Sequence, residues 1–209
     1  MCCLRVYAGV FDKPAKAFLQ KPGPLGANAA VLCDDMLTLK EAPKRIADTP
    51  DFKNHAFFEG SSIRKIGQTY YFVYSSQKNH ELCYATSPYP DRDFRFRGTL
   101  VSNGDVGYKG RSERQRCNAT GTTHGGMEKI NGKYCVFYHR LTHGSDYSRQ
   151  CCAEKLNILP DGSIAQVEMS SCGLHDGDLP GMGEYPAALC CNLTNGKMPH
   201  IANQISKNI

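Results

Sequence analysis

The 209-residue sequence has no tryptophan, no long apolar run and no cluster of basic residues. A helix that crosses a bilayer needs about 18 or more consecutive apolar residues, so the sequence predicts no membrane span. Basic patches for nucleic acid are commonly runs of about five to eight Lys and Arg residues, whereas the 25 Lys and Arg residues here are scattered. The formal charge of +5 therefore predicts neither a nucleic-acid partner nor a membrane partner.

Signals for secretion and for zinc binding are also missing. The first 18 residues, MCCLRVYAGVFDKPAKAF, contain no long apolar stretch, so we expect no secretory signal and a cytoplasmic location. No two of the 11 cysteines have the C-x-x-C spacing typical of zinc sites, and their number is odd. Because disulfides are rare in reducing compartments, we expect the cysteines to be thiols that pack as small apolar residues.

What the sequence does contain is an internal repeat. Residues 63–75 read IRKIGQTYYFVYS, and residues 127–139 read MEKINGKYCVFYH, at a constant offset of 64 residues. Each copy has an apolar segment, a glycine-containing turn and then a run of aromatic and β-branched residues, which predicts a β-hairpin. Further short strands are expected at ELCYATS from Glu81, at FRFRGTLVS from Phe94 and at RQCCAEKLNIL from Arg149.

Four short strands in roughly 60 residues, repeated, are typical of the blades of a β-propeller. The strands are apolar on both faces and no segment has the pattern of a long amphipathic helix, so we predict an all-β chain. Complete blades are expected at 57–116 and 121–169, and AAVLCDDMLTLKEAPKRI at 29–46 resembles the outer two strands of a half blade. The sequence therefore predicts a partial propeller of about two and a half blades over 29–169, preceded by an irregular, divergent leader at 1–28.

Two polar residues are expected to meet at the leading ends of the two hairpins. In the repeat, Glu59 aligns with Thr123, next to His124, and both positions come immediately before the first strand of their blade. Because propeller blades surround a central channel, which their first strands line, we expect Glu59 and His124 to converge there. Phe57 and Phe58 beside Glu59 are expected to keep its carboxyl poorly hydrated, which favours the neutral form and makes it a proton donor. The alternative is a Glu in an exposed loop.

The segments FFEGSSIRKIGQTYYFVYSS, HELCYATS, THGGMEKINGKYCVFYHR and SRQCCAEKL occur in this order. Together they resemble glycoside hydrolase family 43, whose members are five-bladed propellers that act on arabinofuranosides and xylosides. The resemblance covers nearly all of residues 29–169, and the tail at 170–209 is similar to the linker that leads to an accessory β-sandwich in some members. It implies a glycosidase that cleaves O-glycosyl bonds of arabinose- or xylose-containing plant-type oligosaccharides or polysaccharides, with inversion of configuration.

The resemblance also implies roles for three residues. Glu59, in an E-G-S motif, matches the family's general acid. His124, in H-G-G where the family has H-G-S, matches a histidine beneath the sugar site that is often tied to a calcium ion or a water cluster; no other cofactor is implied. Arg149 is similar to an arginine that holds a sugar hydroxyl, although a surface arginine on a strand fits its context equally well. His139 and His143 are expected to be strand-edge or loop residues.

Two acids of the family pattern are missing from this sequence. The resemblance implies a general-base Asp in the first blade and an Asp in the third blade that orients the acid, and the sequence begins after both positions. Asp12 lies in the leader, and Asp34 and Asp35 are expected in a turn far from the channel, so none of them is expected to replace the base. We interpret the chain as a truncated or misread gene product whose open blade faces expose apolar surface and favour self-association.

Three functions stay open at this point: an active glycosidase, a sugar-binding remnant without catalysis, and an assembly module that pairs with a companion chain. Inverting hydrolysis needs a base about 6.5–9.5 Å from the acid, and a general acid alone contributes about 10²–10⁴-fold to the rate. The absence of tryptophan counts against sugar binding because sugar faces often stack on aromatic rings, although 11 Tyr and 9 Phe remain.

Overall fold

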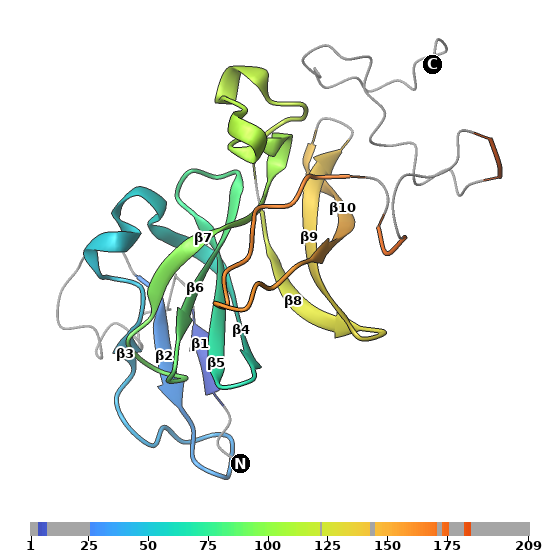
Figure 1. Ribbon diagram of the computed structural model, residues 1–209. Coiled ribbons are helices and arrows are strands. Elements are labelled where there is room, and N and C mark those ends of the chain that lie inside the picture. The colour runs from blue at the N-terminus through green and yellow to red at the C-terminus, as the bar shows by residue number, and fades with distance from the viewer. Residues whose placement is uncertain are drawn as a thin grey trace.

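The computed structural model describes residues 4–7, 26–121, 123–142, 145–170, 173–175 and 182–184. These residues form three antiparallel β-sheets, joined by turns and short 3₁₀ helices (Figure 1). No α-helix occurs among them, and none of their helices is long and apolar enough to cross a membrane. The predicted all-β class is therefore confirmed, and the cysteines within this part of the chain are free thiols, as expected.

The N-terminal sheet consists of three short strands in the order β1-β2-β3, which are Leu4–Tyr7, Asn28–Val31 and Lys44–Arg45. The strand β1 lies in the region 1–28, which was expected to be an irregular leader without strands. After β2 the chain turns at Asp35, whose carboxylate accepts hydrogen bonds of 2.9 Å from the backbone N–H groups of Leu37 and Thr38. Asp34 and Asp35 are therefore turn residues, as predicted.

The central sheet consists of four strands in the order β4-β5-β6-β7, which are Phe57–Ile66, Thr69–Ser76, Glu81–Ser87 and Arg95–Ser102. All four were expected from the sequence. The 3₁₀ helix η2 (Pro50–His55) leads into β4. Three further 3₁₀ helices follow β7 in the loop that leads to the third sheet: η3 (Asn103–Asp105), η4 (Tyr108–Gly110) and η5 (Glu113–Gln115).

The C-terminal sheet consists of three strands in the order β10-β9-β8, where β8 is Gly125–Ile130, β9 is Lys133–Thr142 and β10 is Ser145–Leu156. After β10 the chain crosses back to the central sheet (Figure 1). There the hydroxyl of Tyr84 accepts a 2.7 Å hydrogen bond from the N–H of Ile164, and the N–H of Val167 donates to the carbonyl of Leu100 at 2.8 Å. The segment 158–170 therefore ties the two sheets together.

The two hairpins of the repeat have the same register. Lys65 pairs with Tyr70 across the first hairpin, and Lys129 pairs with Tyr134 across the second. In both hairpins the lysine Nζ lies 5.3 Å from the centre of the tyrosine ring. The predicted hairpins are thus confirmed, and the constant sequence offset reproduces even the cross-strand contacts.

The central sheet is covered on both faces by apolar side chains. Tyr71 and Val73 belong to a buried cluster that they share with Met127 and other residues of the C-terminal sheet. Phe72 and Tyr74 belong to a second buried cluster, shared with the N-terminal sheet and η2. Successive side chains of a strand point to opposite faces, so a strand between two packed layers is apolar at every position. This explains the continuous apolar run of β5.

Candidate active site

The leading ends of β4 and β8 lie side by side and bring Glu59 and His124 together. Glu59 is the third residue of β4, and His124 immediately precedes β8. The Nε2 atom of His124 lies 2.9 Å from the Oε1 atom of Glu59, across 65 residues of sequence. The convergence predicted from the repeat is therefore observed, while the chemical roles of the two residues stay predictions.

A bulge in β4 aims Glu59 at its partner. The register between β4 and β5 shifts on both sides of Glu59, and Gly60 has a φ of +66°, which few residues other than glycine adopt. A Cβ on residue 60 would lie only 2.6 Å from Cδ2 of His124. Glycine in the E-G-S motif therefore permits both the backbone conformation and the close approach of the imidazole, and such bulges commonly redirect side chains beside active sites.

The expectation that Glu59 is poorly hydrated is wrong for this structure. Its side chain is 43% exposed, and the side chain of His124 is 37% exposed. Phe57 packs in the core against Phe72, and Phe58 is itself 50% exposed. A polar contact between side chains this exposed contributes only about 0–1 kcal/mol to stability. The contact between Glu59 and His124 therefore positions the two groups without holding the fold together.

His139 packs against His124, a contact that was not predicted from the sequence. The ring centroids lie 5.4 Å apart in an edge-on arrangement, and the N–H of His139 donates to the backbone carbonyl of His124 at 3.3 Å. His139 lies in β9, the middle strand of its sheet, so its expected strand-edge or loop placement is wrong. The repeat contained a signal for this contact, because His139 aligns with Ser75, which pairs with Glu59.

A buried asparagine fixes the loop that ends at His124. The Nδ2 of Asn103 donates to the carbonyl of Gly121 and to the Oγ1 of Thr123, each at 2.8 Å, and its side chain is fully buried. No sequence pattern predicts this role, because an Asn after a strand is usually a turn residue.

Arg149 lies near the end of the C-terminal sheet where His124 is found. It pairs with Leu141, two residues beyond His139 along β9, and its side chain is exposed. A contact between Arg149 and a sugar stays a prediction. His143 and Asp12 lie outside the described residues.

The described groups around His124 do not form a calcium site by themselves. Calcium takes about 6–8 oxygen ligands, whereas His124 meets one carboxylate among the described residues, that of Glu59. Within the described part of the chain, one group of three metal-ligating side chains lies close together, and His124 is not a member of it. Calcium at His124 therefore stays a prediction, and no chemical step is derived through it.

The chain is similar to curated glycosidases over most of its length. It is 50% identical over 181 residues to a xylosidase/arabinosidase of Thermoclostridium stercorarium, covering 82% of this chain and 38% of that protein. It is 29% identical over 161 residues to a beta-xylosidase of Xylanibacter ruminicola, covering 71% of this chain and 45% of that protein. The chain thus spans less than half of the length of these relatives. No protein-family model matches it.

Solved structures show the same relationship. A GH43_1 enzyme from Xanthomonas citri superimposes with a TM-score of 0.55 at 27% identity, covering 69% of this chain and 42% of that one. The family 43 arabinoxylan arabinofuranohydrolase of Bacillus subtilis superimposes with a TM-score of 0.56, covering 71% of this chain and 31% of that one; at 24% identity it supports the fold alone. From the extended sequence identity and the shared fold together, the chain belongs to glycoside hydrolase family 43.

Proposed function

We propose that the chain carries the general-acid side of a glycosidase that cleaves xylose- or arabinose-containing oligosaccharides with inversion of configuration. The observation that carries this proposal is the 2.9 Å contact between Glu59 and His124 at the leading ends of two repeated hairpins. The names of the relatives support the substrate class: one is a xylosidase/arabinosidase, and the enzyme from Xanthomonas citri was solved in complex with xylose.

In the proposed mechanism, Glu59 donates a proton to the glycosidic oxygen of the leaving group. The Nε2–H of His124 donates to Oε1 of Glu59, so the second carboxyl oxygen carries the transferable proton. The exposed side of Glu59 leaves space for a sugar. Arg149 holds a sugar hydroxyl through its guanidinium donors, which fix the orientation of the ring.

The three sheets are, in this proposal, a half blade and two blades of a five-bladed ring. The relatives are more than twice as long as the region that they share with this chain. The remaining blades supply the carboxylate that activates water about 6.5–9.5 Å from the acid. They also close the channel over Glu59, which is 43% exposed in this chain.

Chemical rescue tests the general-acid assignment by itself, because the anion azide attacks without a general base. Azide attacks the anomeric carbon of an aryl xyloside or aryl arabinofuranoside, the bond to the aryl oxygen breaks, and Glu59 gives its proton to that oxygen. We expect the full chain to form the glycosyl azide of inverted configuration. When the aryl group of the substrate is a poor leaving group, Glu59→Gln should lower the rate of glycosyl azide formation by about 10²–10⁴-fold.

The matched control is Glu128→Gln, because Glu128 is a glutamate on β8 whose side chain is 47% exposed and pairs with Arg64 at 2.7 Å. This variant should keep the full rate. An equal rate for the wild-type chain and Glu59→Gln would overturn the assignment of the acid, and so would the absence of any glycosyl azide.

The second candidate function is sugar binding without catalysis. It is favoured by the hydration of Glu59, whose side chain is 43% exposed. Titration calorimetry with xylotriose separates the two functions: binding without formation of a glycosyl azide supports sugar binding without catalysis.

Light scattering tests self-association through open blade faces. A result that shows only monomers would count against it.

A further inference from the structure

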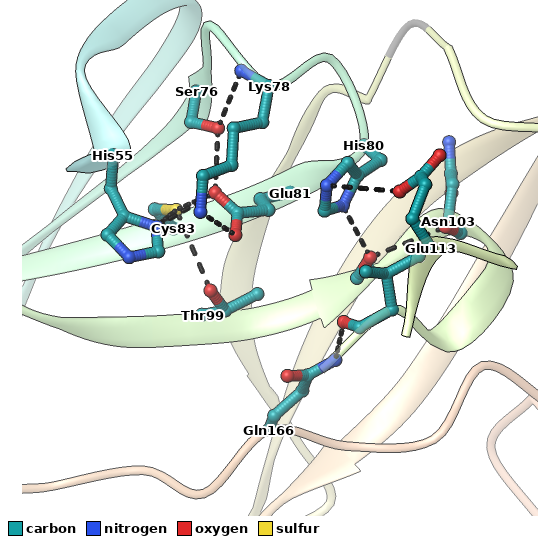
Figure 2. A network of polar contacts seen from close by, with 12 residues as sticks. His55, Ser76, Lys78, His80, Glu81, Cys83, Thr99, Asn103, Glu113 and Gln166 are labelled. Atoms are coloured by element: carbon teal, nitrogen blue, oxygen red, sulfur yellow. Dashed lines mark hydrogen bonds and ion pairs between the residues drawn. The ribbon is translucent and has the colours of Figure 1, made fainter. Parts of the chain in front are cut away.

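A second cluster of polar side chains lies between η2 and the central sheet, apart from Glu59 and His124. His55 ends η2, and Glu81 and Cys83 lie two residues apart on β6, so their side chains share one face of the strand (Figure 2). The Nδ1 of His55 lies 2.9 Å from Oε2 of Glu81 and 4.0 Å from Sγ of Cys83. The distance from Sγ to Oε2 is 3.6 Å. One nitrogen, one oxygen and one sulfur atom therefore lie within about 4 Å of one another.

These separations are close to the edges of a tetrahedral zinc site. With bonds of about 2.0–2.2 Å to nitrogen and oxygen and about 2.3 Å to sulfur, neighbouring ligand atoms lie roughly 3.4–3.6 Å apart. The distance between sulfur and oxygen already has this value. The distance between His55 and Glu81 must widen, and that between His55 and Cys83 must shorten, each by about half an ångström. Side-chain rotations supply shifts of this size.

Neighbouring side chains orient two of the three ligands. The imidazole of His55 stacks on Phe96, with 4.4 Å between the ring centroids, and this fixes the direction of Nδ1. Lys78 binds Oε1 of Glu81 at 3.2 Å and leaves Oε2 facing the other two ligands. Outer partners of this kind hold ligands in place at metal sites. Glu81 and Cys83 are buried, while the side chain of His55 is 23% exposed and provides a path for an ion.

The chemistry of the donors selects the ion. A thiolate and an imidazole are soft ligands that suit Zn²⁺, whereas Ca²⁺ and Mg²⁺ prefer oxygen alone. The hydroxyl of Ser76 lies 2.8 Å from Oε2 of Glu81, so either it or a water molecule can occupy the fourth position. The thiolate and the carboxylate together neutralise the two charges of the ion.

We propose that His55, Glu81 and Cys83 form a binding site for Zn²⁺. The ion takes Nδ1 of His55, whose proton moves to Nε2, and Sγ of Cys83, whose proton is released to solvent. Bound zinc joins His55, at the end of η2, to β6. His55 lies four residues before Glu59 in the sequence. The ion therefore fixes the chain that leads into the strand carrying the candidate acid, independently of any hydrolysis.

Cobalt spectroscopy of the reduced full chain tests this site. Co²⁺ should bind and produce the near-ultraviolet charge-transfer band of a cobalt–thiolate bond, and Zn²⁺ should displace it. Zn²⁺ should also raise the melting temperature, because it binds the folded state. Cys83→Ser should abolish the band and weaken Zn²⁺ binding by more than the roughly 10–100-fold typical of outer partners.

Cys135→Ser is the control, since Cys135 is a buried free thiol on β9 in the other sheet, and it should leave the band unchanged. If Cys83→Ser does not fold, His55→Asn removes a ligand that is partly exposed and should weaken zinc binding likewise. A wild-type chain that binds neither ion overturns the proposal, and the cluster is then a hydrogen-bonded network only. A cobalt–thiolate band that persists in Cys83→Ser places the site elsewhere and also overturns it.

Discussion

In the central sheet, the strand that begins the hairpin carries Glu59, while in the C-terminal sheet the residue before the equivalent strand is His124. The hairpins themselves agree in register and in the contact between lysine and tyrosine. The repeat therefore preserves the scaffold, and the two copies differ at their leading ends, where an acid meets an imidazole. Function resides in such sites, because one scaffold can carry different chemistry.

The largest expected effect on stability comes from a core position at which the two hairpins carry residues of different size. Phe72 and Val136 occupy the same position of the repeat, and both are fully buried. Phe72→Ala should cost about 3–5 kcal/mol because it leaves a large cavity, and Val136→Ala should cost less because fewer atoms are removed. Urea unfolding measures both values. A cost for Val136→Ala equal to that for Phe72→Ala would contradict the equivalence of the two cores.

The second comparison uses the equivalent tyrosines Tyr74 and Tyr138. The hydroxyl of Tyr74 donates to the carbonyl of His55 at 2.8 Å, and that of Tyr138 donates to the carboxyl of Glu154 at 3.1 Å. Tyr74→Phe should cost about 0.5–1.5 kcal/mol, and Tyr138→Phe should cost more, because it leaves the buried carboxyl of Glu154 with one donor fewer. Thermal unfolding decides between this order and its reverse.

The buried carboxyl groups of the two sheets should respond to pH in opposite directions. Burial tends to raise the pKa of Glu81, but hydrogen bonds from His55 and Ser76 outweigh it and hold this pKa below the ordinary 4.5. Burial raises the pKa of Glu154 above 4.5 in spite of its hydrogen bonds from Ser170. Glu81 therefore adds stability that is present above pH 4.5 and is lost as the pH falls through its lowered value.

For Glu154 the sign is reversed: the folded state holds its proton more tightly, so this stability is present below pH 4.5 and is lost as the pH rises through the raised value. Glu81→Gln should flatten the acid limb of the stability profile, and Glu154→Gln should flatten the decline above pH 4.5. Urea unfolding across a pH series measures both limbs. Equal effects of the two variants on the same limb would contradict the opposite shifts.

The smallest expected effect tests whether the two hairpins are energetically alike. Each exposed lysine above a tyrosine ring contributes about 0.5–1 kcal/mol. Because both distances are 5.3 Å, Lys65→Met and Lys129→Met should lower the free energy of unfolding by the same amount. A clear difference between the two variants in urea unfolding would show that the two hairpins share their geometry but not the energy of this contact.

The sequence predicted the hairpins and the meeting of Glu59 with His124 because both follow from local strand patterns repeated at one offset. It did not predict the exposure of Glu59. Phe57 and Phe58 are neighbours in sequence, but alternate side chains of a strand point to opposite faces, so the two rings cannot both cover one carboxyl. Sequence proximity was taken there for spatial proximity.

Two further features depend on contacts that have no local pattern. Asn103 holds the loop before His124 through buried hydrogen bonds, yet its type and position fit an ordinary turn. The strand β1 pairs with β2 across a long intervening segment, and its four residues carry too little pattern to be recognised alone.

The central claim is that Glu59 and His124 act as one catalytic unit, and a double-mutant cycle on azide-rescued turnover tests it most directly. We predict that Glu59→Gln and His124→Asn each slow formation of the glycosyl azide, and that the double variant is no slower than the slower single variant. Losses that multiply in the double variant would show that the two residues act independently, which would contradict the claim.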